Sequence, residues 1–321
     1  MTFRTPICDL LSIDVPIGNA GMAGGTAAAP LAAAVSRAGG LGGLGGIYRE
    51  GPDRLRSEIA AVRAATQRPF SVNLWCFLLD SAPVFLDVCI EEHVPSVTLS
   101  FGAPGDHARR ARDAGLKVIH QVQTVAGARA AVSAGVDAII AQGGEAGGHT
   151  GSVATMALVP QVVDLAGDIP VLAAGGIADG RGLVAALALG AQGVIMGTRF
   201  VAAIEAGASD RHRQRILGAS ADDTVYTDVF DIVDGIRWPD GISGRTIRSA
   251  FTDEWHGRED ELLANREAIR AESNAPEEHD AYAGQAAGLV RDVRPAAQIM
   301  ADVMEEAAGV LARLHRAGTA R

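Results

Sequence analysis

The chain has 321 residues, 48% of them hydrophobic and 21% charged, and its 28 basic and 38 acidic side chains give a formal net charge of −10. This acidic balance, without a cluster of lysines or arginines, argues against a phosphate-binding basic face and predicts that nucleic acid is not a partner. No apolar run is long enough to cross a bilayer and no basic-then-apolar leader opens the chain, so we expect a cytoplasmic protein without a membrane partner.

Short apolar runs with the character of strands recur through the first 200 residues. They span residues 15–21, 41–46, 70–76, 96–102, 117–122, 137–143, 170–176 and 193–200. Alanine-rich stretches with helical spacing lie between them, and several of these end in Ala-Gly or Leu-Gly, a common helix stop. Strand followed by helix, eight times, predicts an α/β fold of the (β/α)₈ TIM-barrel type. A doubly wound open sheet is the alternative, because periodicity does not show closure.

The pattern changes after residue 204. Residues 205–284 are charged, contain "WPDGISG" from Trp238, and hold most of the large aromatic side chains. We expect this segment to be a small, mostly helical cap that is inserted before the last barrel helix and forms part of the substrate region. Apolar residues recur at helical spacing from Ile299 to Leu314. Residues 285–321 are therefore predicted to supply the helix that closes the barrel domain of residues 1–204.

Glycine ends the seventh and eighth predicted strands, in "AAGGIADGRG" and "IMGTRF". In a (β/α)₈ barrel the loops after these two strands commonly bind phosphate through backbone N–H groups. Glycine has no Cβ to keep a phosphate away from the backbone. We therefore expect a phosphate site at Gly175, Gly176, Gly197 and Thr198, with the hydroxyl of Thr198 as an added donor. A plain tight turn at Gly175 and Gly176 is the alternative.

Three further features suggest a flat cofactor. The small residues of "GNAGMAGG" (18–25), with Met22 as their one long side chain, would let an aromatic ring system lie over the backbone. Asn73 lies within an otherwise apolar strand and Gln142 ends another, so each amide needs hydrogen-bond partners. A heterocycle with donors and acceptors would supply them, and backbone groups are the alternative partners.

The stretch "AQGGEAGGHTGS" (141–152) contains five glycines and is too glycine-rich for either a helix or a strand. We expect a loop at the C-terminal face of the barrel that presents His149, and a solvated loop histidine is the alternative. Glu145 is expected to be a helix cap or a surface charge. His120, His107 and His93 have no comparable context and are expected to be structural.

The three cysteines, Cys8, Cys76 and Cys89, lie far apart without the spacing of metal ligands. Neither a disulfide framework nor a metal site is expected. Cys76 follows an apolar run, and we interpret it as a small buried hydrophobe rather than a nucleophile.

With these residues assembled, the chain resembles the nitronate monooxygenase family, which also includes a flavin-dependent enoyl-acyl-carrier-protein reductase. The matching motifs are "AGMAGG" with "LAAAVSRAGGLGGLGG", "FSVNL", "IIAQGGEAGGHTG", "PVLAAGGIADGRGLVAALALGA" and "GVIMGTRF", with "YAGQAAGLVRDVRPAAQIM" near the end. The resemblance covers most of the first 200 residues and, more weakly, the last 40. Residues 205–282 match no segment of the family that can be placed, which leaves the substrate open.

The resemblance implies a flavoprotein that binds FMN non-covalently at the C-terminal face of the barrel. Asn73, Gln142 and Gly147 would contact the ring or the ribityl chain. Met22, with the neighbouring Ala23, would lie against the isoalloxazine. The phosphate would be held by Gly175, Gly176, Ile195, Met196, Gly197 and Thr198. His149 matches the active-site histidine of the family.

The activity implied is the oxidation of alkyl nitronates, and of nitroalkanes as a further substrate class, by O₂ to a carbonyl compound and nitrite. Histidine suits the pocket because it titrates near pH 6.5 and so can donate to the nitro oxygens or accept the α-proton. The rival within the family is an FMN- and NAD(P)H-dependent enoyl-thioester reductase. More distant rivals are a phosphate-binding isomerase or lyase and a flavin-binding protein without turnover of its own. Monomer and dimer are both left open.

Overall fold

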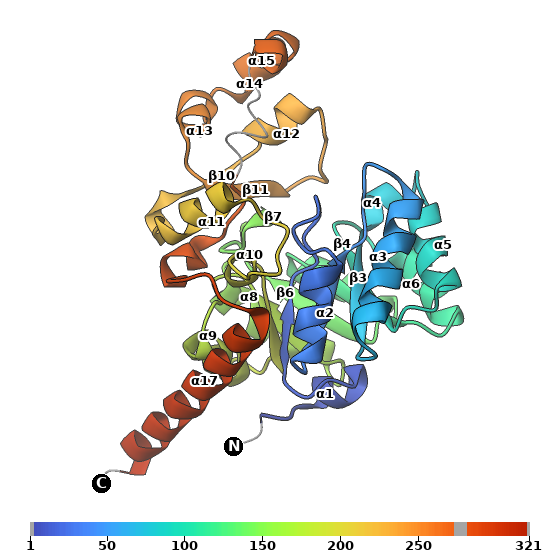
Figure 1. The fold of residues 1–321 in the computed structure, drawn as a ribbon, viewed down its shortest axis with the longest axis vertical. Coiled ribbons are helices and arrows are strands. Elements are labelled where there is room, and N and C mark those ends of the chain that lie inside the picture. Colours follow the sequence, from blue (N-terminus) through green and yellow to red (C-terminus); the bar gives the residue numbers. More distant parts are fainter. Residues whose placement is uncertain (1–2, 273–280, 320–321) are drawn as a thin grey trace.

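The structure, a computed structural model, describes residues 3–272 and 281–319. Eight parallel strands form one sheet in the order β1-β9-β8-β6-β5-β4-β3-β2 (Figure 1). They are β1 (Ile17–Asn19), β2 (Gly42–Gly45), β3 (Phe70–Trp75), β4 (Ser96–Ser100), β5 (Lys117–Val122), β6 (Ala138–Gln142), β8 (Val171–Ala174) and β9 (Gly193–Met196). The two ends of the sheet meet where Gly18 pairs in parallel with Leu41, and the Leu41 N–H donates to the carbonyl of Ile17 at 2.9 Å. The predicted barrel is confirmed and the open sheet is excluded.

Helices surround the barrel on its outer side (Figure 1). They are α2 (Ala29–Arg37), α3 (Pro52–Ala65), α4 (Cys76–Leu79), α5 (Val84–Glu91), α6 (Gly105–Asp113), α7 (Val125–Ser133), α8 (Thr155–Ala166), α9 (Gly180–Ala188), α10 (Thr198–Val201) and α17 (Ala296–Thr319). The backbones of α9 and α17 touch at Gly180, where a Cβ would lie 2.3 Å from the amide nitrogen of Ala307. Helix α17 also packs against α2, so it occupies the last place in the ring of helices.

A short helix that the sequence analysis did not anticipate closes the other end of the barrel. In α1 (Pro6–Leu11), Ile7 and Cys8 are buried against the inward-facing Ile119 and Ile195 of the strands. All three cysteines are free and buried, and burial raises the pKa of the Cys76 thiol to about 12. The interpretation of Cys76 as a small buried hydrophobe is therefore consistent with the structure. The barrel is left with its C-terminal end for a ligand.

The segment after residue 204 forms a layer over that end (Figure 1). Its helices are α11 (Asp210–Leu217), η1 (Ala221–Asp223), α12 (Val229–Asp234), α13 (Ala250–Trp255), α14 (Glu259–Ala264), α15 (Arg266–Glu272) and η2 (Gln285–Leu289). The part of the predicted cap at 273–280 lies outside the described residues. Beside the helices, β10 (Thr224–Thr227), β11 (Ser243–Ile247) and β7 (Gly148–Thr150) form an antiparallel sheet in the order β10-β11-β7.

Strand β7 corrects the expectation that residues 141–152 are neither helix nor strand. It lies between β6 and α8 in the chain, yet its His149 is opposite Gly244 of β11. A three-residue strand whose partner is almost a hundred residues away carries no local period. Its first residue, Gly148, pairs with Arg245 and adopts a positive φ of 69°.

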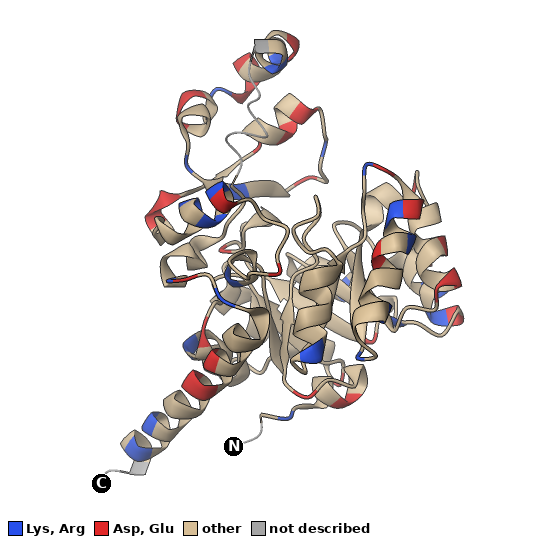
Figure 2. Cartoon of the chain, in the orientation of Figure 1, with Lys and Arg blue, Asp and Glu red and all other residues tan. Residues whose placement is uncertain are grey.

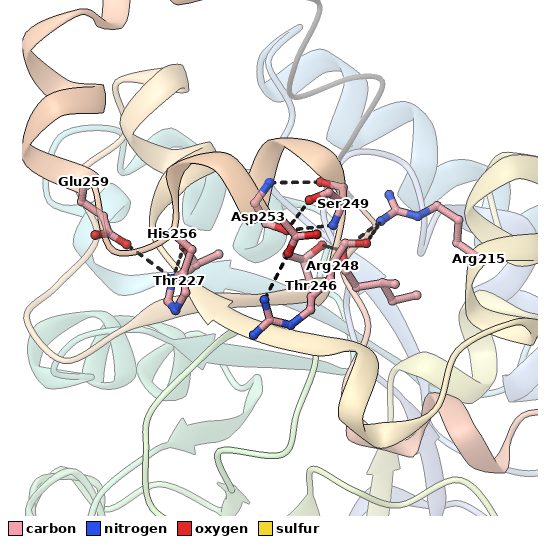
Figure 3. Close-up of polar contacts among 10 residues, drawn as sticks. Arg215, Thr227, Thr246, Arg248, Ser249, Asp253, His256 and Glu259 are labelled. Carbon is pink, nitrogen blue, oxygen red and sulfur yellow. Dashed lines mark hydrogen bonds and ion pairs between the residues drawn. The ribbon is translucent and has the colours of Figure 1, made fainter.

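Polar contacts fix the end of β11, the middle strand of this sheet, to neighbouring helices (Figure 3). The Arg215 guanidinium donates to the carbonyls of Ile247 and Arg248 at 2.9 Å, and Arg248 pairs with Asp253 at 3.1 Å. Ser249 begins α13 with a capping box. Acidic and basic residues are interspersed over the outer helices and the cap (Figure 2). None of the described helices is both long and apolar enough to cross a membrane.

His120 of β5 makes folding sensitive to acid. Its side chain is 2% exposed, and burial lowers its pKa to about 4. The unfolded chain binds a proton there near pH 6.5 and the folded chain does not, so stability present above about pH 6.5 is lost as the pH falls toward about 4. We expect urea unfolding to show about 2 kcal/mol less stability at about pH 5 than at about pH 7 from this residue. That loss should be absent in His120→Leu and kept in the surface control His315→Gln. An equal pH dependence in wild type and His120→Leu would contradict it.

Candidate active site

Two adjoining cavities open at the C-terminal ends of the barrel strands, and both are lined by Ala20, Gln121 and Ile195. The inner one, of about 310 Å³, reaches between Asn73 and Thr98. The outer one encloses about 420 Å³, part of it open to solvent, at the ends of β6, β8 and β9. The cavities therefore lie where the sequence predicted a ligand.

The end of the outer cavity where a phosphate is expected is built from backbone. Gly175 and Gly176 have φ of +103° and +71°, and a Cβ on Gly175 would lie 2.8 Å from the carbonyl oxygen of Gly143. The nearest atom to a Cβ on Gly197 is 3.7 Å away, so packing against protein does not explain this glycine. Thr198 accepts a hydrogen bond from the Gly284 N–H at 2.9 Å, and its own O–H stays able to donate. These groups fit a phosphate that is held by amides and one hydroxyl.

A segment near the end of the chain forms one wall of the outer cavity. Gly147 and Gly284 lie against each other, because a Cβ on Gly147 would be 2.3 Å from the amide nitrogen of Gly284. The Gln285 N–H donates to the Glu145 carbonyl at 2.9 Å, and Gly284 and Ala286 line the cavity. Gly284 and Ala286 were not among the predicted site residues, although the family-like "YAGQAAG" marked this segment.

The two predicted amides both line the cavities but already have protein partners. Asn73 donates to the carbonyl of Gly21 at 2.8 Å and accepts from the Ser100 hydroxyl at 3.0 Å. Gln142 accepts from Gln121 at 3.0 Å and from Gln123 at 2.8 Å. Each amide keeps one N–H hydrogen for a ligand, because its nitrogen has two hydrogens and the structure uses one. Gln121 was not among the predicted site residues. It is a polar residue near the C-terminal end of β5, and a polar residue at that position of a barrel strand is a signal of a site residue.

The remaining predicted cofactor residues are placed differently. Ile195 lines both cavities, whereas the side chain of Met196 is buried on the helix side of the barrel wall. A cofactor contact at Met196 would have to come from its backbone. Met22 is partly buried and packs against the core, and Met22 and Ala23 follow Gly21, which lines the inner cavity.

His149 lies beneath the cap and is largely shielded from solvent, with 12% of its side chain exposed. Its Nε2 lies 2.9 Å from both carboxylate oxygens of Asp231, which is on α12 and 9% exposed. Trp238 stacks on the imidazole with ring centroids 3.5 Å apart and planes at 14°, and its indole N–H donates to Asp231 at 2.9 Å. The backbone carbonyl of His149 accepts from Gln142, so the strand that carries the imidazole borders the outer cavity. The alternative of a solvated loop histidine does not fit this burial.

Sequence reasoning missed Asp231 and did not give Trp238 a role. Asp231 is one acidic residue among many in a charged segment, and only its place on α12 opposite β7 distinguishes it. Trp238 had a signal, because "WPDGISG" is an aromatic residue within a turn-rich stretch.

Aromatic side chains from the barrel meet Trp238 above the strand ends. Ring centroids of Trp75, Phe77 and Phe101 lie 4.9, 5.1 and 5.0 Å from that of Trp238. Trp75 ends β3 and Phe101 directly follows β4, so the cluster joins the barrel to the cap. It gives the mouth of the barrel an apolar surface beside the imidazole.

Glu145 has a structural role here. Its carboxylate accepts from the backbone N–H of Thr155 at 2.8 Å and from the hydroxyl of the same residue at 2.7 Å, so it caps α8. Within residues 3–272 and 281–319, no group of three or more His, Cys, Asp or Glu side chains could hold a metal ion. The donor set at the barrel mouth is instead one of amides, hydroxyls and an imidazole, which suits a phosphorylated heterocycle.

Comparison with known proteins identifies relatives of this chain. A family model described as "Nitronate monooxygenase" matches residues 4–87 and 82–306. A protein of Staphylococcus saprophyticus described as "Probable nitronate monooxygenase" is 36% identical over 309 residues, covering 82% of this chain and 83% of its own. A Mycobacterium tuberculosis protein named (3aS,4S,5R,7aS)-5-hydroxy-7a-methyl-1-oxo-octahydro-1H-indene-4-carboxyl-CoA dehydrogenase is 41% identical over 259 residues, covering 79% and 69%. The structure of FabK from Thermotoga maritima is similar with a TM-score of 0.83 and 39% identity, covering 97% of this chain and 98% of that one.

Proposed function

On the premise that this chain belongs to the nitronate monooxygenase family and is a flavin-dependent oxidoreductase, we propose that it binds FMN and oxidises alkyl nitronates with O₂ to carbonyl compounds and nitrite. Membership of an oxidoreductase family removes the isomerase or lyase that the phosphate site alone would allow. Neutral nitroalkanes are a second substrate class, since loss of the α-proton turns them into the same anion.

The fit of FMN rests on the outer cavity and its phosphate end. Backbone at Gly176 and Gly197, with the Thr198 hydroxyl, would hold the phosphate, and the amides of Asn73 and Gln142 would meet the heterocycle. A bound flavin supplies the electron transfer that the oxidation needs, which side chains do not.

The observation that carries the proposal is that the backbone carbonyl of His149 accepts a hydrogen bond from Gln142, which lines this cavity. Nε2 of His149 is hydrogen-bonded to Asp231, which leaves Nδ1 as the nitrogen that can contact a substrate. As an imidazolium it would donate to the anionic nitro oxygens, and as a neutral ring it would accept the α-proton of a nitroalkane. The apolar surface of Trp75 and Phe101 would keep water from the reacting carbon.

The proposal is tested with the purified protein, incubated with FMN and freed of excess ligand. We expect a flavin absorption spectrum and nitrite release from the nitronate of nitroethane in air. FAD serves as the competing ligand, because the phosphate end is expected to favour the mononucleotide. A protein that stays colourless with FMN, or binds it and releases no nitrite from nitronate or nitroethane, would contradict the proposal.

A second candidate, a reductase of enoyl thioesters that takes hydride from NAD(P)H, is favoured by the similarity to FabK and to the CoA-thioester dehydrogenase. An acidic carrier protein would need a basic surface. Two arginines of α11 are instead engaged by backbone carbonyls of the cap. Arg213 donates to the carbonyl of Ala206 at 2.6 Å, and Arg215 donates to two carbonyls of the β11 end. Anaerobic mixing with NADH separates the candidates, since rapid bleaching of the flavin would support the reductase and an inert flavin would support the monooxygenase.

A further inference from the structure

The active-site imidazole is oriented by the cap and not by the barrel. Both carboxylate oxygens of Asp231 lie 2.9 Å from Nε2 of His149, and the indole of Trp238 covers one face of the ring. We propose that Asp231 is the positioning residue of His149 and that Trp238 aligns the pair, so that substrate meets the Nδ1 edge. This inference rests on the proposed role of His149 in the reaction.

The carboxylate fixes which nitrogen is free. With Nε2–H donating to Asp231, the neutral ring has an unprotonated Nδ1 that can accept a proton, and the charged ring has an Nδ1–H that can donate. Asp231 is buried and its ion-pair partner among the described residues is His149, so the carboxylate faces the same nitrogen in the neutral and in the charged ring. The same carboxylate therefore serves both tasks of the proposed reaction.

The indole restrains the pair in two ways. Its N–H occupies a second acceptor site of Asp231, and its stacked ring opposes rotation of the imidazole. Trp238 in turn lies among the barrel residues Trp75, Phe77 and Phe101. The alignment of the imidazole therefore depends on the contact between the cap and the barrel.

The first test is kinetic. Asp231→Asn preserves the size of the side chain and a polar group. We expect it to lower kcat for nitroethane by about 10- to 100-fold, which is a fraction of what a general base contributes. KM should change less than about threefold. Asp234→Asn is the matched control, because Asp234 lies on the same helix and faces Arg49 at 3.7 Å rather than the imidazole. The control should keep wild-type kcat.

The second test does not depend on turnover. A proton shared between an imidazole nitrogen and a carboxylate resonates well downfield of backbone amides in proton NMR, because the bond is charge-assisted. We expect this signal in wild type and in Asp234→Asn, and its loss in His149→Asn and in Asp231→Asn. Trp238→Phe keeps a ring on the imidazole and removes the indole donor, so it should retain the signal and lose less kcat than Asp231→Asn.

The outcomes separate this inference from the proposed function. If His149→Asn lowers turnover and Asp231→Asn does not, the positioning role is wrong and the function stands. If His149→Asn keeps full turnover, the function assigned to that residue fails. The double variant His149→Asn/Asp231→Asn should be no slower than His149→Asn, because residues that act as a unit are not additive. Additive losses, or a downfield signal that survives in Asp231→Asn, would overturn the inference.

Discussion

Replacing His149 by asparagine is expected to lower turnover of neutral nitroethane by about 100- to 10,000-fold, the range that a positioned acid or base contributes. Asparagine fills similar space and can still donate a hydrogen bond, but it cannot accept the α-proton. Turnover of the preformed nitronate should fall much less, since that anion has already lost the proton. Nitrite release from the two substrates, measured side by side, gives the ratio.

The control for this variant is a second histidine–aspartate pair in the same chain. His107 lies 3.0 Å from Asp80, so His107→Asn breaks a similar contact that involves neither His149 nor Asp231. It should keep both activities. Flavin absorbance should be equal in wild type and in both variants. Full nitroethane turnover in His149→Asn would show that the imidazole has no part in the reaction.

Replacing Gly197 by valine is expected to abolish flavin binding while the fold is kept. Gly197 lines the outer cavity with an ordinary φ of −98°, so a side chain strains no backbone but enters the space where the phosphate is expected. Two lost hydrogen bonds to a charged phosphate, at about 1.5 kcal/mol each or more, amount to at least about a 100-fold rise in the Kd for FMN. Titration of FMN fluorescence against the apoprotein measures it.

Stability must be measured on the same variant. Gly197 begins the short helix α10, and valine there should cost no more than about 1 kcal/mol in the free energy of unfolding. Gly309→Val, on a part of α17 remote from the cavity, is the matched control and should bind FMN normally. Tight FMN binding by Gly197→Val would place the phosphate elsewhere.

The barrel was predictable because each of its strands is a short apolar run that is buried on both faces. All eight observed strands fall within the predicted ranges. The glycines at the ends of β8 and β9 were likewise visible, since Gly176 and Gly197 are adjacent in the barrel whatever the sequence distance between them. The alternation of apolar runs with helical stretches, together with the glycines at strand ends, was sufficient to predict the barrel and these glycine positions.

The cap and half of the site were not predictable in the same way. Strand β10 has four residues and β7 has three, too few for alternation to emerge from a polar segment. Asp231 is recognisable only through its contact with His149, across more than eighty residues of chain. Contacts of this kind are decided by tertiary packing rather than by local sequence.

Strand β7 belongs by chain position to the barrel and by hydrogen bonding to the cap sheet. Exchange of caps between relatives, as a route to new substrates, therefore has to transfer residues 141–152 together with residues 205–290. A cap grafted alone would set its β11 against a foreign strand and leave the histidine without its acidic neighbour. In protein engineering the two stretches have to be treated as one unit, although two complete barrel units separate them in the chain.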